Sequence, residues 1–408
     1  MQKRALYFLV QGESNKLPIP YLLTTLLFTF VALLAAADAS LVSINLVSAF
    51  PALRWVRVHF VTLGILSQVI FGLLPLLVAS LSKKPRPAMR WDIWLTLNTG
   101  FIALVAGFGG MNHPMIFTGG TLIFISATLL LIQLWNVRGG DAPESLKYYI
   151  TGIFYLLVGI IIGTGLYLNW SDALYIKVPL EAHIHANSWG FMSLVFAGLL
   201  VDFVPMITGR PLSTTKNVSL IYWGMTLGAF GLVLGPWLGG SLPPTVSGLI
   251  LHLSSTIWLI VLTIQAFKAS GKLNSPGAWH LISSYVWIIA PIGMAPFILL
   301  GYLEGGPIES IAPQALIYGW VLQFGIALVP YIARRFFLKE ENPQLGGCWG
   351  SLSTATAGSL FVWASIFIIP ARGALYGIGF ALFAIALIHP LKELAEIART
   401  GLQKIEAS

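Results

Sequence analysis

Two histidines two residues apart, His183 and His185, stand at the start of a long apolar segment, in the stretch EAHIHANSWGF. Neutral imidazole is the commonest side-chain ligand of transition metals, and histidine also binds haem iron. On a regular helix, residues i and i+2 point roughly 200° apart. The two histidines therefore cannot serve one centre on a regular helix. They could serve two centres on two sides of the segment, or one of them could cap the helix.

The position of His185 recurs in two other apolar segments. In each segment a histidine or glutamine is followed five residues later by glycine, and then by a second glycine and a proline. These polar residues stand 126 and 129 residues apart, four predicted spans each time; they are His59, His185 and Gln314. Self-similarity at a fixed period indicates a repeated structural unit. We therefore predict three four-helix units, the third closed by the spans at the two ends of the chain.

The elements that must position these residues are membrane spans. Of the 408 residues, 57% are hydrophobic and only 9% are charged, whereas soluble domains carry about 25% charged residues. A transmembrane helix needs roughly 20 mostly apolar residues. We predict an all-α polytopic membrane protein, a single membrane domain over residues 1–408, with twelve transmembrane helices near 21–48, 56–81, 94–112, 116–136, 148–169, 184–207, 218–238, 244–267, 279–303, 313–334, 351–369 and 373–390.

The net charge of +8 reflects topology and gives no indication of nucleic-acid binding. If the loops alternate between two sides, one side receives all but four of the 23 lysines and arginines; the four exceptions are Arg54, Arg57, Lys177 and Arg372. Such a bias marks the cytoplasmic side. It predicts cytoplasmic N- and C-termini in a prokaryotic inner membrane, with membrane lipid as the surroundings. The first sixteen residues lack the features of a secretory signal.

Further candidates lie in other spans. His252 lies about two turns inside span 8, Asp38 lies well inside span 1, and Asp202 lies toward the inner end of span 6. Intramembrane acids are functional candidates by default, although Asp38 could equally serve helix packing. Histidines near span ends often only pack or form hydrogen bonds in the headgroup region. That interpretation stays open for each of the histidines. The single cysteine, Cys348, leaves no disulfide and no cysteine-based metal site.

The pattern of spans and histidines resembles a known superfamily. Twelve spans, cytoplasmic termini, a threefold four-helix pattern and histidines at the outer ends of spans 2 and 6 resemble subunit I of the haem–copper oxidases, which includes cbb3-type cytochrome oxidases and nitric oxide reductases. The stretch HANSWGF, followed by VPMITGRPL, also looks like the nitric-oxide-response membrane proteins of the NnrS family.

The resemblance implies a divergent member without a complete binuclear centre. In the oxidases, histidines of spans 2 and 10 bind the low-spin haem; His59 matches the first, whereas span 10 has no histidine near Gln314. One histidine of span 6 and a pair on span 7 bind copper there. His183 or His185 matches the first, but span 7 has none. His59 and His185 could face each other and bind a b-type haem, and His183, His185 and His252 could bind copper.

The implied activity is electron transfer or chemistry of nitric oxide or oxygen, in an oxidoreductase related to cytochrome c oxidase, with other respiratory-type subunits or a redox partner. Two alternatives stay open. A secondary transporter, for example of a metal ion, also commonly has twelve spans, although transporter halves usually repeat as sixes or as inverted repeats. A non-catalytic membrane subunit would use none of the histidines.

Overall fold

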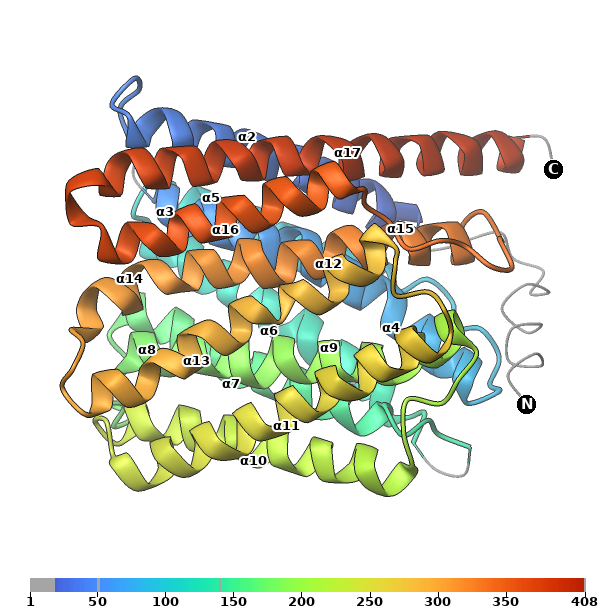
Figure 1. Ribbon diagram of the computed structural model, residues 1–408, viewed down its shortest axis with the longest axis horizontal. Coiled ribbons are helices and arrows are strands. Elements are labelled where there is room, and N and C mark those ends of the chain that lie inside the picture. Colours follow the sequence, from blue (N-terminus) through green and yellow to red (C-terminus); the bar gives the residue numbers. More distant parts are fainter. Residues whose placement is uncertain (1–18, 50–51, 139–140, 407–408) are drawn as a thin grey trace. The chain divides into compact units, whose positions relative to one another are not determined.

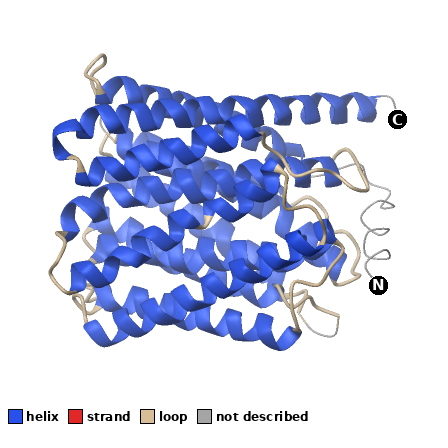
Figure 2. Ribbon diagram, viewed as in Figure 1, coloured by secondary structure: helices blue, strands red, loops and turns tan. Residues whose placement is uncertain are grey.

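The computed structural model describes residues 19–49, 52–138 and 141–406, and every regular element within these ranges is a helix (Figure 2). The all-α prediction is thereby confirmed for the described part of the chain. The predicted absence of a secretory signal concerns residues outside these ranges, as do the basic residues Lys3, Arg4 and Lys16 of the charge argument.

Eleven helical segments of the described chain are long and apolar enough to cross a membrane. They make this a multi-pass membrane protein. They correspond to predicted spans 1 to 10 and span 12. The remaining prediction, 351–369, coincides with helix α16 (Trp349–Phe367), which has the necessary length but is not one of the eleven. Its serines and threonines lower its hydropathy. The total of twelve spans therefore stays a prediction.

The chain divides into two compact units. The first contains Leu73–Gly271. Its helices pack mainly as neighbours in sequence, α5 on α6, α6 on α7 and α10 on α11, while α7 and α10 both pack on the middle of span 6. Its elements are α5 (Trp91–Gly109), α6 (His113–Trp135), α7 (Leu146–Leu168), α8 (Pro179–His185), η2 (Ala186–Met192), α9 (Ser193–Thr208), α10 (Thr215–Trp237) and α11 (Leu242–Ala269).

The second unit contains the described residues before Leu73 and after Gly271. Here α17, the last helix of the chain, packs along α2, the first described helix (Figure 1). The elements are α2 (Ile19–Ser43), α3 (Leu53–His59), η1 (Phe60–Leu66), the start of α4 (Ser67–Leu81), α12 (Pro276–Ser284), α13 (Val286–Leu299), α14 (Gly305–Leu316), η3 (Ile317–Leu322), α15 (Gln323–Phe336), α16, η4 (Ile369–Ala371) and α17 (Arg372–Glu406). The predicted single domain over residues 1–408 stays a prediction.

Spans 2, 6 and 10 share an irregularity that the sequence did not predict. Each contains a π-helical segment, η1, η2 or η3. The segment begins directly after His59 and His185, and three residues after Gln314. π-Helical segments are rare and are frequent at functional sites. The three repeat positions predicted from sequence therefore share a distinctive backbone as well as a residue pattern.

Several predicted span ends differ from the structure. Span 1 was expected to continue to residue 48, but α2 ends at Ser43, shortly before Asn45 takes a left-handed backbone conformation. Span 9 is divided by Tyr285 into α12 and α13. Span 12 was expected to end near residue 390, whereas α17 continues to Glu406. The first part of α17 is apolar, whereas its C-terminal part is polar and still helical.

Candidate functional site

His183 is held against α7. Its Nδ1 lies 2.8 Å from the backbone oxygen of Gly159, and donates a hydrogen bond to it. The amide of Asn187, one turn later, donates to the backbone oxygen of His183 at 2.8 Å. Glycine at positions 159 and 163 makes room for these side chains, because a Cβ there would lie 2.4 Å from Asn187 and 2.5 Å from the imidazole. These glycines accommodate polar side chains as well as close helix packing.

His185 faces a different helix. Its Nδ1 lies 2.6 Å from the backbone oxygen of Leu232 on α10, and its Nε2 lies 3.9 Å from a carboxylate oxygen of Glu181. The expectation that His183 and His185 point to different sides of span 6 is borne out by these two contacts. In both rings Nδ1–H donates a hydrogen bond to a backbone carbonyl, so a neutral ring carries its lone pair on Nε2. A metal-ligating histidine usually donates the N–H of its other ring nitrogen in the same way.

The imidazole of His252 packs edge-to-face on the indole of Trp189. Its ring is fully buried and lies 5.7 Å from the Trp189 ring, which is in turn 6.2 Å from the ring of His185. The Nε2 of His252 lies 3.1 Å from Ser193 Oγ and 3.2 Å from the backbone oxygen of Trp189. Since Trp189 belongs to the π-helical segment η2, the histidine links α11 to the irregular part of span 6.

The three histidines proposed as copper ligands do not converge. His183 and His185 reach carbonyls on different helices, and the Nε2 of His252 contacts the backbone of span 6. In the part of the chain that the structure describes, no three histidine, cysteine or acidic side chains lie close enough together to hold a metal ion.

In the second unit, His59 has the same ring orientation. Its Nδ1 lies 2.8 Å from the backbone oxygen of Trp55, one turn earlier, and its ring stacks on the Trp55 indole with centroids 4.1 Å apart. His59 belongs to the second unit and His185 to the first. Their predicted pairing on one haem stays a prediction.

Gln314, the repeat counterpart of the histidines, has a different environment. It is buried at 3% exposure and accepts a hydrogen bond from the hydroxyl of Tyr376 on α17. Near it, Arg57 packs its guanidinium over Phe380 at 4.9 Å and Tyr376 at 5.6 Å. Asp38 on α2 buries one carboxylate oxygen that forms no hydrogen bond. Gln314 is thus engaged in helix packing within this unit.

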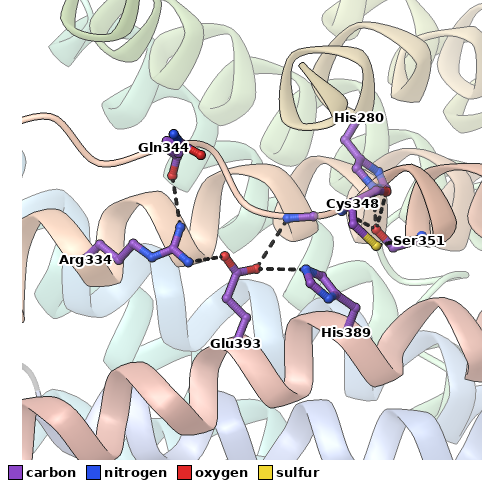
Figure 3. A network of polar contacts seen from close by, with 8 residues as sticks. His280, Arg334, Gln344, Cys348, Ser351, His389 and Glu393 are labelled. Carbon is purple, nitrogen blue, oxygen red and sulfur yellow. Dashed lines mark hydrogen bonds and ion pairs between the residues drawn. The ribbon is translucent and has the colours of Figure 1, made fainter. Parts of the chain in front are cut away.

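Sequence reasoning missed a polar network at the start of α16 and on α17 (Figure 3). The carboxylate of Glu393 lies 2.7 Å from the guanidinium of Arg334 and accepts from the backbone N–H of Gly347 at 3.3 Å. His280 is fully buried and its Nε2 lies 2.9 Å from Ser351 Oγ. The chain after residue 390 is polar, so its hydropathy gives no indication of this network.

A second polar site lies in the first unit, around Asp202, the intramembrane acid of span 6. The hydroxyl of Tyr149 donates to the carboxylate of Asp202 at 2.5 Å. The sequence signal was present, because an acid inside an apolar span is exceptional, but its partner could not be read from span 6 alone. Comparison with known proteins adds nothing to these sites, since no protein-family model and no curated protein matches the chain.

Proposed function

We propose that this chain is a divergent membrane protein of the haem–copper oxidase subunit I type, which binds a b-type haem through a histidine in the outer leaflet. The observation that carries the proposal is the Nδ1 hydrogen bond of His185 to Leu232. It places the lone pair on Nε2, where an iron ligand needs it. His59 has the same orientation at the equivalent position of span 2.

The histidines suit a haem, because a single histidine side chain can hold haem iron in a protein. Imidazole also binds copper, so copper stays the alternative metal for the same side chains. The three π-helical segments support the threefold pattern on which the resemblance rests. A bound haem would supply one-electron chemistry, or a site for nitric oxide or oxygen, while the chain's own residues orient the imidazole.

The deciding experiment is an optical spectrum of the purified protein, oxidised and dithionite-reduced, with iron and copper analysis of the same sample. We expect a Soret band that shifts on reduction and is lost in His185→Ala. His113→Ala is the matched control, because His113 is an exposed histidine of the same unit. Protein that is produced with ample haem and contains no iron would contradict the proposal. Stoichiometric copper without haem would assign the chain to copper handling.

A secondary transporter is the second candidate, and one observation favours it. Span 9 is distorted at Tyr285, whose backbone stays in the right-handed helical region, and α13 contains Pro291 and Pro296. Hydrophobic segments interrupted by proline commonly carry substrate sites in transporters. Uptake of a metal ion into proteoliposomes by a haem-free protein would support this function. A protein that has neither cofactor nor uptake would be a structural subunit.

A further inference from the structure

A buried acid lies at the C-terminal end of span 6. Asp202 is on α9, at 8% exposure, and α9 ends at Thr208, roughly 9 Å further along at 1.5 Å per residue. Asp202 and His185 are therefore near opposite ends of one span. Neither the proposed haem site nor the repeat pattern gives the acid a role.

The partners of Asp202 are hydroxyl groups. Tyr149 donates to its Oδ2 at 2.5 Å. Ser145, one turn before Tyr149 and fully buried, faces the same pair. The Oγ of Ser145 has no well-formed hydrogen bond. A neutral carboxylic acid could donate its proton to such an oxygen. The site thus contains one carboxyl and two hydroxyls.

Basic groups do not neutralise this acid. None of the ion pairs in the described chain includes Asp202. On α7, Lys147 is engaged by Glu144 at 2.8 Å and by Ser219. On α11, His252 bonds to Ser193 and Trp189. The remaining titratable groups on the helices packed against α9, and in the loop after it, are tyrosines and exposed lysines or arginines: Tyr148, Tyr155, Tyr167, Tyr222, Lys216, Lys268 and Arg210.

We propose that Asp202 is a proton-binding site, a neutral carboxylic acid in the resting protein that exchanges one proton with water near the end of span 6. The physical reason is that a buried carboxylate without a cation is very unfavourable in an apolar interior. Uptake converts the carboxylate to the acid by forming one O–H bond, and release returns the proton to water. No electron is transferred, and the site needs no haem.

Infrared spectroscopy of the full chain in lipid nanodiscs tests this directly. We expect a carbonyl band of a protonated carboxyl at neutral pH that disappears at alkaline pH and is absent in Asp202→Asn. Glu393→Gln is the matched control and should keep the band, because Glu393 is ion-paired. A folded wild-type protein that lacks the band at neutral pH would overturn the proposal. So would a band that persists unchanged in Asp202→Asn.

Two further measurements keep the test decisive. If Asp202→Asn does not fold, Tyr149→Phe retains the acid but removes its hydrogen bond, and the band must shift; an unshifted band would refute the site. If sodium ions remove the band at constant pH, Asp202 binds a metal cation and the proton assignment is wrong. These results do not depend on haem content, so the failure of one proposal leaves the other intact.

Discussion

Asp202 in the first unit and Glu393 in the second are equally buried, at 8% exposure each, yet their surroundings differ. Glu393 has an arginine at 2.7 Å, a backbone N–H and a histidine at 3.9 Å. Asp202 has a tyrosine hydroxyl and a neighbouring serine. The comparison shows that burial alone does not decide how an acid is used. A charged partner makes it a structural anchor, and hydroxyl partners leave it able to exchange a proton.

The largest expected effect comes from removing the partner of Glu393. Arg334→Ala leaves a carboxylate at 8% exposure without its cation, and breaking a buried pair in this way costs about 3 kcal/mol. Thermal unfolding in detergent measures the loss. Arg399→Ala removes the same charge from an exposed position of α17 and should have little effect. Equal losses in the two variants would show that the ion pair of Arg334 with Glu393 does not stabilise the fold.

A second prediction concerns the ring that bonds to Asp202. A Cβ at Gly198 would lie 2.6 Å from Cε1 of Tyr149, so Gly198→Ala must displace this ring, and we expect a loss of roughly 1–3 kcal/mol. Gly325 is the second glycine of the pattern in span 10, 11 residues after Gln314 where Gly198 lies 13 residues after His185, and a Cβ there meets only Val329 at 3.9 Å. Gly325→Ala should therefore leave the unfolding midpoint almost unchanged. A larger loss in Gly325→Ala would contradict the packing described.

The two isosteric amide substitutions compare the acids directly. Glu393→Gln removes a charge that pairs with Arg334, and we expect a loss of about 1–2 kcal/mol. Asp202→Asn keeps an oxygen that accepts from Tyr149 and removes no ion pair, so we expect a change below about 0.5 kcal/mol at neutral pH. Unfolding of both variants under one condition gives the difference. If Asp202→Asn is the more damaging of the two, the contrast between the acids is wrong.

The smallest effect is expected at His389. Its Nε2 lies 3.9 Å from Glu393, and its side chain is 45% exposed. An exposed pair at this distance contributes at most about 0.5 kcal/mol. His389→Ala should therefore unfold within that margin of the wild-type protein, and a loss as large as that of Arg334→Ala would make the histidine part of the anchor.

The sequence predicted the helical class and the approximate position of most spans, because continuous apolar runs are a long-range signal that survives local detail. It also predicted repeat positions at His59, His185 and Gln314, and the π-helical segments begin within three residues of them. It could not predict the π-helical segments, since a one-residue change of hydrogen-bond register does not alter hydropathy. The interruption of span 9 at Tyr285 could not be predicted either, because it does not change the hydropathy of the segment.

The candidate sites were predictable only as residue types. His183 and His185 were expected to point in different directions, and they do. Which carbonyl each ring meets depends on glycines of another helix, Gly159 and Gly163, which no local pattern in span 6 contains. The ion pair of Arg334 with Glu393 joins residues 59 positions apart in sequence, and only the packing of α15 against α17 brings them together.

The π-helical segments also bear on the history of the chain. A π-helical turn accommodates one residue more than an α-helical turn, so a single inserted residue is the simplest origin of such a segment. Segments η1, η2 and η3 begin within three residues of His59, His185 and Gln314, at nearly corresponding places in spans 2, 6 and 10. If the three four-helix units descend from one ancestor, one insertion before the copying accounts for all three segments. The irregularity would then be older than the threefold arrangement itself.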